Sequence, residues 1–83
     1  MDNKFEVGKQ YRGTMLYGGD VHYTVIDRTD HQVTMREQWI AEDTGEEAKN
    51  VSKFDIEIEG GIEKIMIWEY KGHEAWIYAN EGR

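Results

Sequence analysis

Runs rich in β-branched and aromatic residues recur along the chain, and short turns that contain glycine separate them. This pattern is typical of β-strands joined by tight turns. It predicts strands at residues 9–17, 21–27, 31–40, 50–59, 62–70 and 73–79. We expect two-residue turns at Gly18-Gly19, Gly60-Gly61 and Lys71-Gly72, because glycine readily adopts the positive φ that such turns require. The predicted fold is therefore all-β, a small antiparallel meander of about six strands that forms an SH3-like barrel or a compact sandwich.

The last two turns imply a register that gathers apolar side chains on one face of the sheet. A two-residue turn at 60–61 sets Glu57 opposite Lys64 and sets apolar residues of the two strands opposite each other. A two-residue turn at 71–72 sets Ile67 opposite Trp76 on the same face. These hairpins predict a core that contains Phe54, Ile56, Ile65, Ile67, Trp76 and Tyr78.

The first half of the chain adds to this core. A short loop after Arg28 sets Val25 opposite Val33 and Tyr23 opposite Met35, so these four residues join the predicted core. We expect residues 41–50 to form a loop, because the glycine and the like charges of this stretch oppose a helix.

The opposite face of the last hairpin is unusually apolar. It carries Met66, Trp68, Tyr70, His73, Ala75 and Ile77. A sheet with one solvated face normally alternates apolar and polar residues. In one interpretation, the N-terminal strand or the loop at 41–50 covers this face, since small barrels coil strongly. In the other, the face is an exposed interface whose polar rim is formed by Asp55, Glu57 and Glu59.

Length and composition narrow the class of protein. A chain of 83 residues can form one core, so we expect a single small β domain over residues 1–83. The chain has no cysteine, which excludes disulfides and thiolate metal sites. No apolar run is long enough to cross a membrane, and the first residues lack the pattern of a signal peptide. These features predict a cytoplasmic protein.

Acidic residues are concentrated in the middle of the chain. The sequence has 17 acidic and 10 basic residues, for a net charge of −7. The excess lies in residues 37–63, where Glu37, Glu42, Asp43, Glu46, Glu47, Asp55, Glu57, Glu59 and Glu63 outnumber Lys49 and Lys53. Such a surface repels nucleic acid. The segment is either a solvated loop and strand face, or an electronegative patch that docks on a basic, nucleic-acid-binding protein.

No motif for catalysis or metal binding stands out. His22, His31 and His73 fall on separate predicted elements, so we expect no metal and no cofactor. The chain also lacks the motifs of nucleophilic hydrolases and nucleotide-binding loops. Glu69 and Glu74, opposite each other on the core-side face, are the one candidate acid–base pair, and at a hairpin end we expect them to be solvated. The sequence therefore favours a protein that is not an enzyme.

Binding of single-stranded nucleic acid would use basic residues interleaved with aromatic ones. The candidates lie in the N-terminal half: Tyr11, Arg12, Tyr17, Tyr23, Arg28 and Arg36. The acidic middle of the chain opposes this function, so we rank it third.

One stretch of the sequence suggests an origin. Its residues are Phe5, Val7-Gly8-Lys9, Tyr11, Tyr23-Thr24-Val25-Ile26, Arg28-Thr29 and Val33-Thr34. The order resembles small, largely uncharacterised proteins of Firmicutes phages and integrated mobile elements, which open with a similar glycine-lysine-tyrosine strand. The resemblance covers the first two fifths of the chain and carries no catalytic residue. It implies a bacterial mobile-element origin, and small acidic proteins of such elements include inhibitors that occupy the nucleic-acid site of host defence nucleases.

The first hypothesis is a non-enzymatic protein-interaction module of this kind. Its partner would contact the hairpin face (Met66, Trp68, Tyr70, His73 and Ile77, with Asp55, Glu57 and Glu59), the acidic loop (Glu42, Asp43, Glu46 and Glu47), or both. The alternative is a homo-oligomeric β-barrel that holds a small ligand between subunits, with tyrosine and tryptophan side chains as walls.

Overall fold

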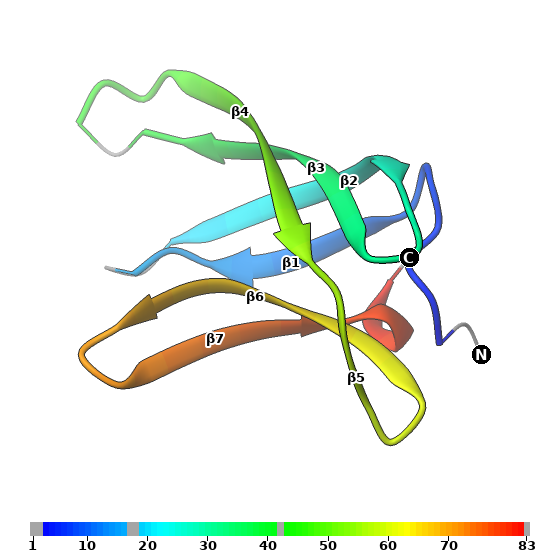
Figure 1. Ribbon diagram of the computed structural model, residues 1–83. Helices are drawn as coiled ribbons and strands as arrows, with labels where there is room; N and C mark the ends of the chain where they lie inside the picture. The colour runs from blue at the N-terminus through cyan, green and yellow to red at the C-terminus, as the bar shows by residue number, and fades with distance from the viewer. Residues whose placement is uncertain (1–2, 17–18, 42, 83) are drawn as a thin grey trace.

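The computed structural model describes residues 3–16, 19–41 and 43–82. Within these residues the strands are β1 (Gln10–Thr14), β2 (Asp20–Arg28), β3 (Gln32–Ile40), β4 (Glu47–Asp55), β5 (Glu57–Glu59), β6 (Ile62–Tyr70) and β7 (His73–Tyr78), followed by a short 3-10 helix, Ala79–Glu81. Strands β1-β2-β3-β4 form one antiparallel sheet and strands β5-β6-β7 a second one (Figure 1). The prediction of an all-β antiparallel meander is confirmed, and the two sheets do not close into a barrel.

The predicted strand at 50–59 is divided between the two sheets. The chain leaves the four-stranded sheet after Asp55 and enters the three-stranded sheet at Glu57. At the crossing, the Ile56 amide donates a hydrogen bond to the His31 carbonyl at 2.8 Å. Strand β4 also begins at Glu47, so the last residues of the predicted loop at 41–50 are paired with β3 instead.

Side chains that alternate along the strands meet in one core between the sheets. Val25, Val33 and Met35 are each at most 1% exposed, and Tyr23 is 4% exposed, as predicted from the sequence. The predicted core residue Ile65 is also fully buried, and Phe54, Ile56 and Ile67 pack against the core while partly buried. Other buried residues were not predicted, among them Phe5, Tyr11, Val21, Ile77 and Ala79.

The register of β2 and β3 differs from the prediction by two residues. Val25 lies opposite Met35 and Tyr23 opposite Glu37, with a bulge between Val25 and Asp27. Because side chains alternate with a period of two, a shift of two residues leaves each one on its predicted face. Tyr23, Val25, Val33 and Met35 were therefore assigned to the core correctly from a register that was wrong.

A bulge in the last hairpin has the opposite effect. The turns at Gly60-Gly61 and Lys71-Gly72 are confirmed, and Trp68 lies opposite Ala75 as expected. Between Met66 and Trp68 the register shifts by one residue, so Ile65 pairs with Ile77 rather than with Tyr78. One residue is enough to exchange the faces of β7. Trp76 and Tyr78 therefore leave the core, and Ile77 enters it.

The N-terminal segment closes one end of the core. Phe5 is 1% exposed and packs edge-on against Tyr11, with ring centroids 5.2 Å apart. Its backbone amide donates to Glu63 Oε1 at 2.8 Å, and its carbonyl accepts from Arg28 Nη1 at 2.8 Å. Arg28 and Glu63 form a bidentate ion pair, in which Arg28 Nη1 lies 2.6 Å from Glu63 Oε1 and Arg28 Nη2 lies 3.0 Å from Glu63 Oε2. This buried cluster ties the N-terminal segment to both sheets.

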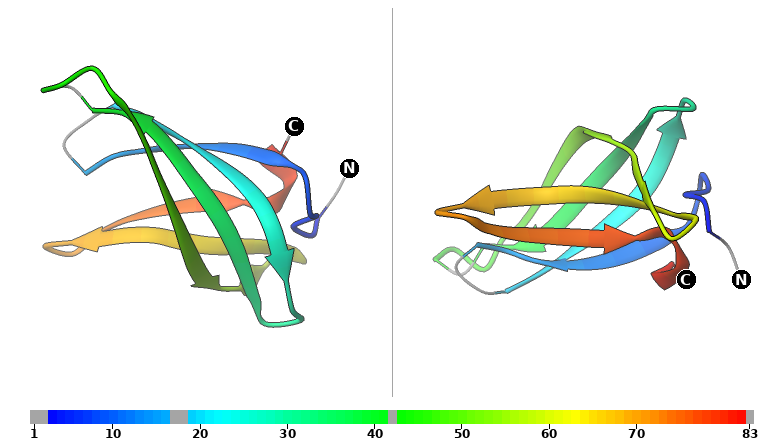
Figure 2. Two further views of the ribbon diagram at one scale, coloured as in Figure 1. Left: turned by 90° about the horizontal axis from the view of Figure 1, so that it is seen from above. Right: turned by 60° about the horizontal axis from the view of Figure 1, so that its bottom comes forward.

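The hairpins point to opposite ends of the molecule. The described ends of hairpins β1–β2, β3–β4 and β6–β7 lie at one end of the molecule, and the tip of β5–β6 lies at the other end, near the described N-terminal and C-terminal segments (Figures 1 and 2). None of the described residues forms a helix long and apolar enough to cross a membrane.

Candidate binding surfaces

The outer face of the three-stranded sheet combines aromatic and acidic side chains. The observed register places on it Met66, Trp76, Tyr78, Lys64, Glu57, Glu59, Glu69 and Glu74, which we call the aromatic–acidic face. Met66 is 36% exposed, and Trp76 and Tyr78 are partly exposed. The opposite face of the same strands holds the buried residues Glu63, Ile65 and Ile77. Alternation along the strands thus separates an apolar inner face from this mixed outer face.

Lys64 shows how the aromatic–acidic face holds a cation. Its ammonium lies 4.2 Å from the ring centroid of Trp76 and 5.9 Å from that of Tyr78. It also lies 3.3 Å from Glu59 Oε1. Aromatic ring faces attract ammonium groups, and a carboxylate at the edge strengthens the contact.

Carboxylates fix the orientation of both rings. Trp76 Nε1 donates to Glu74 Oε2 at 2.9 Å, and the Tyr78 hydroxyl donates to Glu59 Oε2 at 2.8 Å. The hydrogen bonds from Tyr78 and Lys64 lower the pKa of Glu59, and the bond to Glu59 raises the pKa of Tyr78. Glu59 is therefore an anion at neutral pH and Tyr78 a neutral donor. Four carboxylates on this face oppose the single ammonium of Lys64, so the face carries net negative charge.

Several residues predicted for the hairpin face lie elsewhere. Because of the bulge after Met66, Trp68 and Tyr70 share the side of the sheet that faces the core. Trp68 Nε1 donates to the Thr14 carbonyl at 2.7 Å, across to the other sheet. Ile77 is 1% exposed and is part of the core, so its placement on an exposed face was wrong. Of the predicted hairpin-face residues, Met66 lies on the aromatic–acidic face.

The remaining members of the predicted hairpin face lie near the β6–β7 turn. His73 pairs with Tyr70 next to this turn, and both side chains are exposed. The Lys71 ammonium lies 5.3 Å from the Tyr70 ring. These residues form a hairpin tip of their own, on the face opposite to Met66.

The acidic segment at 37–63 does not form one surface. Asp43, Glu46 and Glu47 lie at the β3–β4 hairpin, whereas Glu57 and Glu59 lie in β5, toward the opposite end of the molecule (Figure 1). The other predicted members are dispersed. Glu63 is buried in its ion pair, Asp55 belongs to the four-stranded sheet and accepts from Gln32 Nε2 at 2.9 Å, and Glu42 lies outside the described residues. The rim predicted from Asp55, Glu57 and Glu59 is thus reduced to the two glutamates of β5.

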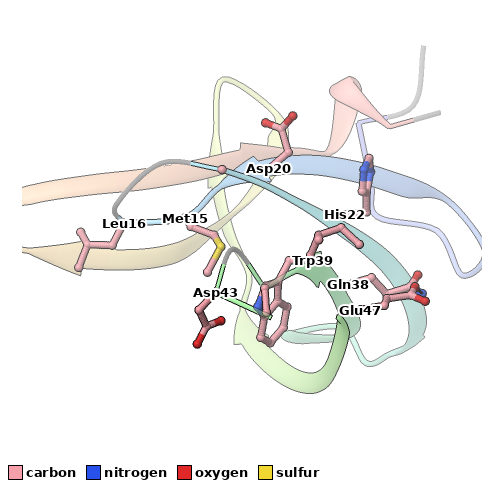
Figure 3. A pocket seen from close by; sticks show the side chains of 11 residues that line it. Met15, Leu16, Asp20, His22, Gln38, Trp39, Asp43 and Glu47 are labelled. Atoms are coloured by element: carbon pink, nitrogen blue, oxygen red, sulfur yellow. Dashed lines mark hydrogen bonds between the residues drawn. The ribbon is translucent and has the colours of Figure 1, made fainter. Parts of the chain in front are cut away.

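A groove of about 920 Å³ lies between the β1–β2 and β3–β4 hairpins, at the end of the molecule opposite to β5 (Figure 3). We call it the hairpin groove, and its lining consists of Met15, Leu16, Gly19, Asp20, His22, Gln38, Trp39, Ile40, Ala41, Asp43 and Glu47. Met15, Leu16 and Ile40 are 36%, 37% and 60% exposed. The sequence analysis did not identify this groove, because residues that are distant in the sequence line it.

The candidates for catalysis and nucleic-acid binding are not assembled into a site. Glu69 and Glu74 are paired as expected, but both are exposed on the outer face rather than on the core side. Tyr11 and Tyr23 are buried and Arg28 is bound to Glu63, while Tyr17 lies outside the described residues. The described residues include no group of three or more His, Cys, Asp or Glu side chains arranged to hold a metal ion.

The chain matches no family model, and comparison with curated proteins and with solved structures gave no match. The geometry of the two surfaces is therefore the basis for inferring a function.

Proposed function

We propose that this protein is a non-enzymatic interaction module that binds a basic segment of a partner protein on its aromatic–acidic face. The observation that carries the proposal is the position of the Lys64 ammonium, 4.2 Å from the Trp76 ring and 3.3 Å from Glu59. A lysine or arginine of a partner would use the same two kinds of contact along the rest of the face.

Preorganisation supports this function. The hydrogen bonds from Trp76 to Glu74 and from Tyr78 to Glu59 hold both rings in place before a partner arrives. Fixed aromatic side chains lose little conformational entropy on binding, and aromatic residues and methionine are enriched at the centres of interfaces. Glu57 and Glu69 form no side-chain hydrogen bond or ion pair with the described residues, so both remain available to cationic groups.

The class of partner follows from the charge. A basic surface that normally holds nucleic acid is complementary to a face with four carboxylates and partly exposed aromatic rings. A module that occupies such a surface would act as an inhibitor of the nucleic-acid-binding protein. The mobile-element resemblance of the N-terminal strands makes host nucleases the first proteins to test.

A display experiment with charge-matched variants tests the proposal. Random peptides displayed on phage are selected on the immobilised protein, and an enriched peptide is measured by calorimetry. We expect enriched peptides to contain several lysines or arginines. Glu57→Gln with Glu69→Gln should weaken binding roughly five-fold or more, on the scale of one charge-assisted contact.

The matched control is Glu46→Gln with Glu47→Gln, which changes the net charge equally at the β3–β4 hairpin. It should change the affinity less than two-fold, on the scale of distant, screened charges. Equal weakening by both pairs would show that only net charge matters, and this would contradict the proposal. Enrichment of peptides without basic residues would contradict it as well.

A further inference from the structure

The hairpin groove has the dimensions of a small-molecule site. Its volume of about 920 Å³ lies within the usual range of ligand pockets. Its walls are the ends of the β1–β2 and β3–β4 hairpins, which extend beyond the last pair of β2 and β3, His22 with Gln38. Backbone hydrogen bonds close both loops, from Met15 N to the Gly19 carbonyl at 2.9 Å and from Ala41 N to the Glu46 carbonyl at 2.8 Å. The described parts of the walls are therefore held in shape without a ligand.

The walls of the groove are mainly apolar. Met15, Leu16 and Ile40 expose a third or more of their surface, and the indole of Trp39 is partly buried beside them. Large apolar side chains gathered in one concave place are the usual mark of a binding site, because burial of their surface is favourable.

The polar groups of the groove select for positive charge. Its described lining residues include three carboxylates, Asp20, Asp43 and Glu47, and no lysine or arginine. Asp20 is 3.4 Å from Arg12, in a pair whose side chains are 57% and 70% exposed, and such a pair is weak. Glu47 accepts a hydrogen bond from Gln38 at 3.1 Å, which leaves its negative charge in place. The Asp43 side chain forms no hydrogen bond or ion pair with the described residues.

We infer that the hairpin groove binds an organic cation, an apolar molecule that carries one ammonium or guanidinium group. The apolar body lies against Met15, Leu16, Trp39 and Ile40, and the cation lies near Asp43 and Glu47. The indole face of Trp39 offers the kind of contact that Trp76 makes with Lys64 in the same protein, at 4.2 Å. An anionic ligand such as a nucleotide would find no lysine or arginine among the described lining residues. This inference does not depend on the proposed function, because the two surfaces share no residue.

A series of three probes with the same body tests the inference. The ¹⁵N-labelled protein is titrated with 4-phenylbutylamine, 4-phenylbutan-1-ol and 4-phenylbutyrate, and amide shifts are followed by NMR. We expect saturable shifts at the described groove residues with the amine, and binding that is roughly five-fold weaker or more with the alcohol. We expect no saturable shift in the groove with the carboxylate. Equal binding of all three probes, or no saturable shift in the groove with the amine, would overturn the inference.

Paired variants identify the two parts of the site. Asp43→Asn with Glu47→Gln should remove the preference for amine over alcohol, whereas Glu57→Gln with Glu69→Gln, an equal change of charge outside the groove, should preserve it. Ile40→Thr should weaken binding of both probes, and Ile58→Thr should not, since Ile58 is an exposed isoleucine outside the groove, at 71% against 60% for Ile40. If dilution of the protein alone moves the groove resonances, a second copy occupies the groove, and the inference is wrong.

Discussion

Replacement of Glu63 tests the contribution of the buried ion pair that joins the two sheets. The Glu63 side chain is 7% exposed and that of Arg28 is 21% exposed. Glu63 accepts hydrogen bonds from Arg28 Nη1, Arg28 Nη2 and the Phe5 amide. Removal of this carboxylate leaves a cation and a backbone amide inside the protein without their main acceptor.

The burial of the Arg28–Glu63 ion pair sets the loss of unfolding free energy that we expect. Removal of one partner of a buried ion pair costs about 3–5 kcal/mol of unfolding free energy. Glu63→Gln retains an oxygen that can accept from the Phe5 amide, and water reaches the partly exposed Arg28. We therefore expect a loss of about 2–3 kcal/mol, equivalent to a fall in Tm of roughly 10–20 °C for a domain of this size. Glu63→Ala should lose about 3–5 kcal/mol.

The pH dependence of the stability loss tests whether the negative charge of Glu63 is its cause. Burial raises the pKa of Glu63, but the hydrogen bonds from Arg28 and the Phe5 amide, with the attraction to Arg28, lower it further, so the net pKa is below its usual value. An acid whose pKa is lower in the folded state contributes stability above its unfolded pKa, and this stability is lost as the pH falls through the folded pKa. The difference between wild type and Glu63→Gln should therefore be full at pH 7 and shrink below about pH 4.

The assay is urea unfolding followed by tryptophan fluorescence and circular dichroism. Asp43→Asn is the control, because it removes an exposed carboxylate that forms no hydrogen bond or ion pair with the described residues. It should change stability by no more than about 0.5 kcal/mol. If Glu63→Gln changes the unfolding free energy as little as this control does, the ion pair does not contribute as argued.

Three further predictions concern the core and the hairpins. Burial, with a smaller contribution from Glu37, raises the pKa of Tyr23 to about 12. Because Tyr23 ionises at a lower pH in the unfolded chain, the unfolding free energy should fall above about pH 10. Tyr23→Phe should remove part of this fall when urea unfolding is measured at alkaline pH. Gly13→Ala would place a Cβ 2.7 Å from Tyr23 Cε2 and 2.8 Å from Ile67 Cδ1, so calorimetry should show a loss of about 1–3 kcal/mol. Trp68→Phe removes the 2.7 Å hydrogen bond to the Thr14 carbonyl and should cost about 1 kcal/mol in urea unfolding, whereas Met66→Ser, on the outer face, should cost less.

The strands and turns of this protein follow from local sequence patterns. Glycine residues predict the β5–β6 and β6–β7 turns. In the structure, Gly60, Gly61, Lys71 and Gly72 have the positive φ that such turns require, between 49° and 80°. Strand register predicted half of the buried β-branched and aromatic residues among the described ones, namely Tyr23, Val25, Val33 and Ile65. A prediction of this kind tolerates an error of two residues in the register, as at Val25 and Met35.

The bulges could not be predicted, and they determine which residues form the candidate sites. The run Ile65-Met66-Ile67-Trp68 is apolar at every position, so alternation gives no signal for the extra residue. The bulge in this run moves Trp76 and Tyr78 to the outer face, where they join Met66 and Glu59. The hairpin groove escapes sequence analysis for another reason, since loops that are distant in the sequence form it.

The most direct test of the proposed function is an NMR titration of the ¹⁵N-labelled protein with a basic peptide from the display selection. The proposal predicts saturable shifts at residues 57–59, 64–66 and 74–78 and at the Trp76 indole N–H, with an affinity that falls as salt is added. Shifts centred on the acidic residues of the β3–β4 hairpin would contradict it. Shifts spread evenly over all the acidic residues would do so too, because they would indicate nonspecific attraction to the net negative charge.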